Sequence, residues 1–178
     1  MDIEALKYPI GKYKKPEPLD SKEIQSCIET LQQFPPKLKE AVKGLGKEEL
    51  LYKHRPEGWT VRQLVHHCAD SHLNAFIRIK LALTENNPTV KPYFENEFAK
   101  LKDTTESPVE WSLMILEGVH NRLVVILQAM SKDDFKRTYF HPEYKKTVPL
   151  EELVTTYAWH CNHHLAHIKQ ALKHKNIF

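Results

Sequence analysis

Glycine is scarce in this sequence, which has only five glycines among 178 residues. Neither GxGxxG nor GxxxxGK(S/T) occurs. Both motifs need glycine where the backbone approaches a phosphate closely. The sequence therefore argues against the two common nucleotide-phosphate loops, and it leaves few glycines for tight β-hairpin turns.

Long apolar runs are also missing. No stretch approaches the roughly 20 apolar residues that a transmembrane helix requires. The opening segment, MDIEALKYPIGKYKKPEP, has no apolar run after a basic region, so no secretory signal is expected. The three cysteines, Cys27, Cys68 and Cys161, are an odd number at irregular spacing, which is typical of reduced thiols. We therefore expect a cytoplasmic protein that makes no membrane contact.

The charge excess is small, because 26 Lys and Arg residues oppose 23 Asp and Glu residues, giving a net charge of +3. No Lys/Arg block is present, so the electrostatic footprint that nucleic-acid binding needs is missing. Hydrophobic residues make up 41% and charged residues 28%, as in ordinary globular proteins. A chain of this length can bury one core, and we predict a single domain over residues 1–178.

Four segments between the proline clusters show the apolar periodicity of amphipathic helices. They cover residues 20–43, 60–85, 107–130 and 150–174. The pattern predicts an all-α four-helix bundle, either up-and-down or with a crossover connection.

Shorter features complete the predicted fold. Residues 94–101 favour a short helical piece, and residues 137–148 a brief extended segment. Residues 1–19 are expected to form an extended N-terminal arm packed on the bundle, with a disordered tail as the alternative. Pro35 and Pro36 lie inside the first long segment, so that helix should kink or start its main part there.

Histidines are concentrated in the segment YAWHCNHHLAHIKQAL, residues 157–172. At 100° per residue, His160 and His164 fall on the edge of the apolar stripe, and His163 and His167 fall further out. Two histidines four residues apart stand on consecutive turns and can bind one metal ion. A helix of hydrogen-bonded or solvated histidines is the alternative, and this segment alone does not decide between them.

A metal site needs a third protein ligand, and the segment 60–85 offers His66, His67 and His72. Helical geometry turns His66 away from the apolar stripe, but it does not choose between His67 and His72. Two other histidines, His120 and His141, are expected to be ordinary polar residues. Cys68 and Cys161 fall in the apolar stripes and are expected to be small core residues, not ligands.

Taken together, GWTVRQLVHHCADSH (58–72) and YAWHCNHHLAHI (157–168) resemble the DinB-like metal-binding superfamily, and within it the YfiT branch of metal-dependent hydrolases from bacilli. YPIGKY near the start, LTENNPTVKPY, and HPEY before the last helix also resemble that branch. The resemblance thus spans essentially the whole chain and implies a four-helix bundle. Family members often form homodimers, which the resemblance implies here too.

The family's metal motif has a tryptophan followed eight residues later by a histidine, which here are Trp59 and His67. The motif ends in H-x-x-x-H, here His160 and His164. The resemblance therefore implies three histidine ligands. Of the other histidines in this segment, we expect His167 to support the ligands and His163 to be solvated. Three imidazoles suit zinc, which we expect, or nickel, and leave a coordination position open for water.

Three functions follow from such a site. The first is a metal-dependent hydrolase acting on a small-molecule substrate, with Asp70 or His163 as a candidate proton acceptor and the catalytic residues left unassigned. The second, which the resemblance implies, is transfer of a low-molecular-weight thiol such as bacillithiol. The three arginines Arg62, Arg78 and Arg122 could bind its carboxylates. The third is a non-catalytic, metal-stabilised binding protein.

Overall fold

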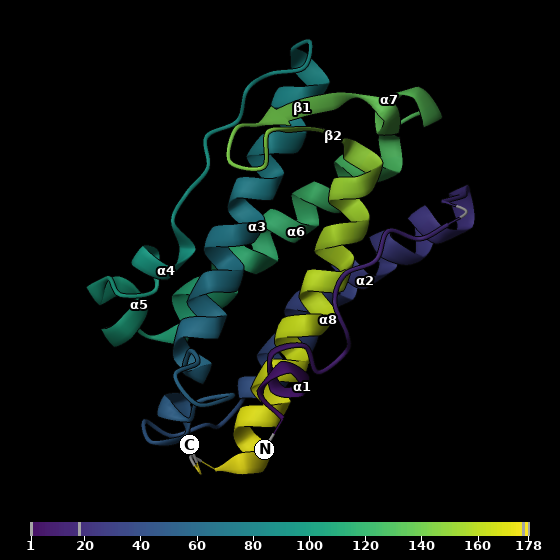
Figure 1. Cartoon of the computed structure of the whole chain (residues 1–178). Coiled ribbons are helices and arrows are strands. Elements are labelled where there is room, and N and C mark those ends of the chain that lie inside the picture. The colour runs from purple at the N-terminus through teal and green to yellow at the C-terminus, as the bar shows by residue number, and fades with distance from the viewer. Residues whose placement is uncertain (1, 18, 176, 178) are drawn as a thin grey trace.

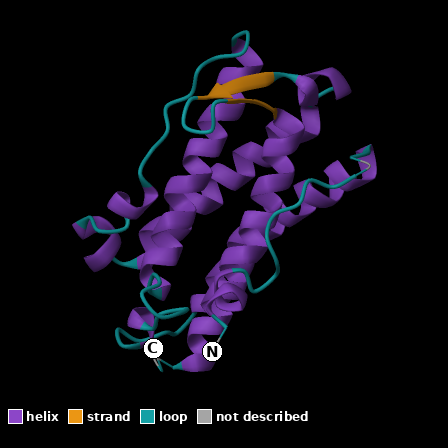
Figure 2. Cartoon of the chain, viewed as in Figure 1, coloured by secondary structure: helices purple, strands orange, loops and turns teal. Residues whose placement is uncertain are grey.

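The computed structural model describes residues 2–17, 19–175 and 177, and four long helices dominate it (Figure 1). These helices are α2 (Ser21–Val42), α3 (Val61–Thr84), α6 (Val109–Ala129) and α8 (Leu150–His174). Their bounds agree with the predicted segments to within two residues. The prediction of an all-α four-helix bundle is confirmed, and Figure 2 shows how little of the chain is strand.

Seven short elements connect or flank the four long helices. They are α1 (Ile3–Lys7), the 3₁₀ helix η1 (Glu49–Leu51), α4 (Glu95–Phe98), α5 (Lys102–Glu106), α7 (Lys132–Lys136), β1 (Thr138–His141) and β2 (Lys146–Pro149). The two strands pair antiparallel, with Thr138 opposite Pro149, so the predicted extended segment is a small hairpin. The predicted helical piece at 94–101 is shorter than expected, because α4 ends at Phe98 and α5 follows.

The connection between α3 and α6 decides the topology. His66 bonds to Ser112, and six residues further along α3 His72 bonds to His120, so α3 and α6 run parallel. Two parallel neighbours need a connection that returns along the bundle, and residues 85–108 make that return (Figure 1). Of the two predicted connectivities, the crossover is therefore the correct one.

Helices α3 and α8 run antiparallel, because His67 lies beside His160 while Ser71, one turn later, lies beside Tyr157. Helix α2 contacts α6 and α8, and α3 contacts the same two helices. In Figure 1, α2 and α8 run in one direction and α3 and α6 in the other. The bundle therefore places α3 and α8 side by side along their length.

The two prolines inside α2 do not interrupt it, so the helix does not start anew at Pro35. A proline has no backbone N–H, and Pro35 therefore cannot bond to the carbonyl of Leu31 one turn earlier. That carbonyl instead accepts a hydrogen bond from Nδ1 of His120 on α6, at 2.6 Å. A bond between two helices thus replaces a bond within one.

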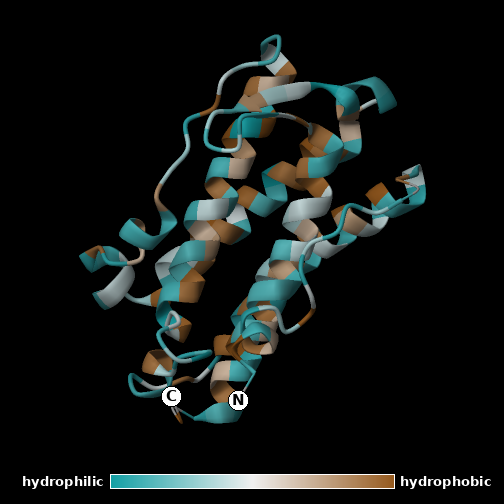
Figure 3. Ribbon diagram, in the orientation of Figure 1, coloured by the Kyte–Doolittle hydropathy of each residue, from teal (hydrophilic) through white to brown (hydrophobic). Residues whose placement is uncertain are grey.

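The core lies between the four long helices, along which apolar and polar residues alternate (Figure 3). Its largest fully buried side chains are Phe34, Leu31, Leu38, Leu64, Ile79, Leu116, Leu123, Leu127, Leu150, Ile168, His72 and His120. The three cysteines are buried and unpaired, and Cys68 and Cys161 lie in the core, as predicted. None of the helices in the described part of the chain combines the length and apolar composition that a membrane crossing needs.

The N-terminal arm packs on α8, as predicted, although it contains the short helix α1 and is not wholly extended. The Gln170 side-chain amide donates to the carbonyl of Leu6 at 2.9 Å, and the Tyr13 hydroxyl lies 2.7 Å from that of Thr155. These bonds join the arm to both halves of α8. The alternative of a disordered tail is excluded for the described residues 2–17.

A capping box fixes the start of α3, since the Thr60 hydroxyl accepts from the Gln63 N–H and the Gln63 side chain accepts from the Thr60 N–H. We expect Thr60→Ala to lower the free energy of unfolding by about 1 kcal/mol, the usual value of an N-cap. Urea denaturation measures it. The matched control is Thr84→Ala at the other end of α3, where the hydroxyl bonds only to carbonyls of the preceding turn. Equal effects of the two changes would contradict the assignment.

Candidate metal centre

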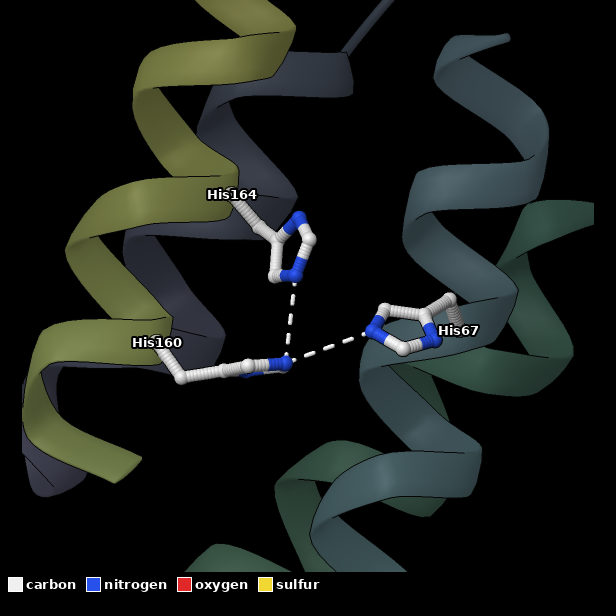
Figure 4. A group of neighbouring side chains, drawn as sticks. All are labelled: His67, His160 and His164. Carbon is white, nitrogen blue, oxygen red and sulfur yellow. Dashed lines mark hydrogen bonds between the residues drawn. The ribbon is translucent and has the colours of Figure 1, made fainter. Parts of the chain in front are cut away.

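Three histidine side chains converge between α3 and α8 (Figure 4). Nε2 of His160 lies 3.2 Å from Nε2 of His67 and 3.1 Å from Nε2 of His164. The candidate ligand atoms of the three rings all lie within 4.8 Å of one another. The structure thus brings together the three residues that the resemblance implied; that they bind a metal ion stays a prediction.

The surrounding fold holds these rings in place. The capping box at Thr60 sets the start of α3, and the Trp59 ring just before it packs 4.6 Å from the ring of His67, centroid to centroid. His160 and His164 stand one turn apart on α8, with ring centroids 4.3 Å apart. All three side chains point toward one another across the gap between the two helices (Figure 4).

The spacing suits a small cation. A tetrahedral ion with nitrogen ligands at about 2.0–2.1 Å separates those ligands by roughly 3.3 Å. The two measured contacts are close to that value. Burial lowers the pKa of His67 to about 4 and holds the pKa values of His160 and His164 well below the ordinary 6.5. At neutral pH the rings are therefore uncharged, which is the form that binds metals.

Behind His160 lies a row of hydrogen-bonded rings, here called the longer histidine chain. Nδ1 of His160 lies 3.1 Å from Nε2 of His72, and Nδ1 of His72 lies 2.9 Å from Nε2 of His120. Nδ1 of His120 lies 2.6 Å from the Leu31 carbonyl oxygen, the one that Pro35 leaves without a helical donor. The chain therefore runs from the cavity to α2.

This terminal carbonyl fixes the position of every proton in the longer histidine chain. A carbonyl oxygen only accepts, so Nδ1 of His120 carries the hydrogen and its Nε2 is an acceptor. A neutral imidazole has one N–H, and burial keeps His72 and His120 neutral by lowering their pKa values, that of His120 to about 4. His72 therefore donates from Nδ1, and His160 donates from Nδ1 to His72. Nε2 of His160 is left with a free lone pair facing His67 and His164.

A shorter histidine chain does the same for His164. Nε2 of His167 lies 3.0 Å from the carbonyl oxygen of Lys7 at the end of α1, so this nitrogen donates. Nδ1 of His167 is then an acceptor, 3.5 Å from Nδ1 of His164, and it favours a proton on that atom. With that tautomer, Nε2 of His164 is bare as well. It would then face the lone pair of His160 at 3.1 Å, and a cation between the two nitrogens would remove their repulsion.

The other histidines of these helices lie outside the centre. His66 is buried but faces α6, where it bonds to Ser112 at 2.7 Å, so its predicted exclusion from the site is consistent with the structure. His163 is buried, so the prediction that it is solvated is wrong. The reason is the N-terminal arm and Trp159, since the rings of Tyr8 and Trp159 lie 6.0 and 4.3 Å from that of His163.

A cavity of about 590 Å³ opens beside the three histidines. Helices α3 and α8 form its long walls, and the β1–β2 hairpin contributes to its lining. Neither predicted proton acceptor lines it. His163 lines a neighbouring hollow, which shares Trp59 and His164 with this cavity, and Asp70 lines neither. The pKa of Asp70 is raised to about 6, chiefly by burial and then by the charge of Asp103.

The sequence does not reveal the longer histidine chain. It offers His72 only as a candidate ligand and predicts that His120 is an ordinary polar residue. The available signal was Pro35, since a proline inside a helix leaves the carbonyl four residues earlier without a donor. A fully buried histidine on a neighbouring helix is a natural partner for such a carbonyl.

The chain is similar to known proteins over most of its length. A family profile described as the DinB superfamily matches residues 30–168. A Bacillus subtilis protein named "Putative metal-dependent hydrolase YfiT" is 41% identical over 165 residues, 93% of each chain. A "Putative metal-dependent hydrolase" from Bacillus cereus is 43% identical over 174 residues, 98% of this chain and 99% of its own.

The fold comparison agrees with the sequence comparison. The solved structure of Bacillus subtilis YfiT matches with a TM-score of 0.92 at 40% identity, covering 95% of this chain and 97% of that one. That structure is described as "a probable metal-dependent hydrolase with an unusual four-helix bundle topology". Similarity of this extent shows the family and the four-helix bundle fold.

The longer histidine chain should control metal affinity. We expect His120→Leu to weaken Zn²⁺ binding about 10–100-fold, as loss of such supporting bonds usually does, because His72 then has no acceptor. His66→Leu removes an equally buried histidine whose bonds go to Ser112 and the Ser107 carbonyl, away from the centre. This control should lose stability and keep its Zn²⁺ affinity. Zn²⁺ titration against a competing chelator measures both variants.

A second readout for the same chain is the proton position on His160. Nitrogen-15 NMR of the metal-free protein should show the hydrogen on Nδ1 in the wild type and in the His66→Leu control. Weakening of Zn²⁺ binding by the same factor in both variants, or a hydrogen found on Nε2 of His160 in the wild type, would contradict the chain as described.

Buried neutral histidines also make stability depend on pH. Burial lowers the folded-state pKa values of His54 and His120 from the ordinary 6.5 to about 4. Below pH 6.5 these two histidines become protonated in the unfolded chain, whereas in the folded chain they stay neutral until the pH approaches 4. The free energy of unfolding should therefore fall as the pH drops from 6.5 to about 4, by up to about 1.4 kcal/mol per pH unit for each such group. Urea titrations with a chelator present test this, and a flat profile would contradict it.

Proposed function

The chain belongs to the DinB superfamily, and we propose that it is a metal-dependent hydrolase in which His67, His160 and His164 hold a divalent ion. The observation that carries this proposal is the convergence of the three histidine rings on the wall of a cavity, with Nε2 of His160 3.1 Å from Nε2 of His164. Two hydrogen-bonded chains that end at carbonyl groups support this arrangement. The names of the relatives assign the same class of reaction.

The composition of the site favours catalysis over a purely structural role. Among the described residues, the histidine, cysteine and carboxylate groups able to share one ion here are the three histidines alone. Structural zinc sites normally have four protein ligands, whereas catalytic sites have three and keep a position open. Cys68 and Cys161 are fully buried in the core and add no ligand. Zinc is the ion we propose, and nickel is the alternative that imidazole ligands also suit.

The ion would act as a Lewis acid at the open position, polarising a carbonyl and lowering the pKa of water to about 7. The protein itself would supply the ligands of the ion and the walls of the substrate cavity. His67, His160 and His164 present uncharged nitrogens, and the cavity beside them admits a small ester or amide. Tyr157 forms part of the wall, with its hydroxyl donating to the Ser71 carbonyl at 3.1 Å.

One observation favours a second candidate function, thiol transfer. Of the three arginines considered for binding a thiol's carboxylates, Arg78 alone lines the cavity. Arg62 donates to the Thr105 carbonyl at 3.1 Å, and the Arg122 guanidinium lies 5.0 Å from the centre of the Phe76 ring. A carboxylate-bearing thiol would fit the same cavity, so the test must separate the two reactions.

The experiment compares wild type, His164→Ala and His66→Leu for bound metal and for turnover of carboxylic esters and amides, with and without an added thiol. We expect bound metal and thiol-independent hydrolysis in the wild type. His164→Ala should lose the metal and reduce turnover at least 100-fold, because two imidazoles bind a divalent ion weakly. His66→Leu should keep its metal.

Two outcomes would contradict the hydrolase proposal. A strict requirement for thiol would identify a transferase. Loss of metal and stability in His164→Ala, with no turnover of any substrate by the wild type, would identify a non-catalytic, metal-stabilised binding protein.

A further inference from the structure

The cavity extends well beyond the three histidines, and Arg78 and His141 line its other part. Arg78 follows His67 by eleven residues on α3. At 1.5 Å and 100° per residue, it stands on nearly the same face of the helix, roughly 16 Å further along the axis. His141 is the last residue of β1, so the hairpin brings it to this end. The cavity therefore has two ends, the metal centre and the Arg78 end.

Both residues at the Arg78 end carry a buried polar atom without a partner. These atoms are Nε of Arg78 and Nδ1 of His141. His141 is only 3% exposed. A buried polar group without a hydrogen bond costs about 1–3 kcal/mol, so an unpaired one calls for a ligand or another explanation. Two such groups lining one cavity point to a ligand that accepts from both.

The charges at this end are also unbalanced. Within the described residues, no ion pair or hydrogen bond engages the guanidinium of Arg78. Three glutamates line the same cavity, but Glu95 and Glu143 are exposed and Glu152 is paired with Lys146. The positive charge of Arg78 therefore remains available to an anion.

Neighbouring groups at this end can donate hydrogen bonds. Burial and the nearby charge of Arg78 both lower the pKa of His141, so this ring is neutral and can carry a hydrogen on its unpaired Nδ1. The His141 ring stacks on that of Tyr144, with centroids 4.4 Å apart. The pKa of Tyr139 is raised, chiefly by burial, so this phenol keeps its hydrogen. The site thus offers donors and a positive charge.

We propose that the Arg78 end binds a carboxylate of the substrate, with His141 as a second donor. A guanidinium matches a carboxylate with two parallel hydrogen bonds. This inference rests on the proposed function, because the metal centre then holds the scissile group at the other end. The substrate class is an elongated ester or amide whose free carboxylate lies on the order of 10–16 Å from the reacting carbonyl, given the offset along α3.

The test uses ligands that reach both ends. Alkyl hydroxamates bind Zn²⁺ through the hydroxamate, and a terminal carboxylate on the same chain would reach Arg78. Isothermal titration of the Zn²⁺-loaded protein compares each ω-carboxyalkyl hydroxamate with its neutral alkyl counterpart over a series of chain lengths. We expect the carboxylate to improve affinity at least tenfold at one optimal length. The gain should disappear in Arg78→Gln and shrink in His141→Phe, which keeps a ring against Tyr144.

Arg122→Gln is the matched control, because it removes an exposed arginine outside the cavity and should retain the full gain. The neutral hydroxamates should bind all four proteins equally. A carboxylate that gives no gain at any length, or a gain that survives in Arg78→Gln, would overturn the inference while the metal centre stands.

A measurement without metal separates this inference from the proposed function. In the chelated protein, decanoate should shift the Arg78 Nε–H resonance in the wild type and shift it less in His141→Phe at the same concentration. An unshifted resonance in the wild type overturns the carboxylate site. Failure of every hydroxamate to bind the Zn²⁺-loaded protein, with the decanoate shift intact, contradicts the metal centre alone.

Discussion

Two backbone carbonyls outside the usual helical hydrogen bonds determine which nitrogen of each α8 histidine faces the candidate metal centre. The carbonyl of Leu31 lacks its helical donor because residue 35 is proline, and the carbonyl of Lys7 stands at the end of α1. The Leu31 carbonyl accepts from His120, which is linked through His72 to His160. The Lys7 carbonyl accepts from His167, which contacts His164. Because carbonyls never donate, the direction of both chains is fixed without any charged group. The centre is thus prepared for a cation by neutral, buried groups.

The fold could be predicted from the sequence because it follows from the periodicity of apolar residues. Proline clusters and capping residues indicated where the four long helices begin and end. The helical repeat placed His160 and His164 on one face of the last helix. The periodicity did not predict the crossover connection. The parallel packing of α3 and α6 depends on contacts between the two helices, and the periodicity of each segment says nothing about its neighbours.

The candidate site could be predicted only in part, for the same reason. Helical geometry left His67 and His72 equivalent, and both are in fact buried and in contact with His160. His67 reaches the other two rings directly, whereas His72 contacts the rear nitrogen of His160. His163 could not be placed correctly, because an arm more than 150 residues earlier in the chain covers it. These are tertiary contacts, and they cannot be predicted from the periodicity of a single helix.

The separation of the candidate ligands along the chain has a consequence for biogenesis. His67 and His160 are 93 residues apart, and His160 and His164 both lie on α8, the last of the four long helices along the chain. A nascent chain that has not yet formed α8 therefore lacks two of the three candidate ligands. Under the proposed function, an ion can be bound at this centre only after α8 has packed against α3.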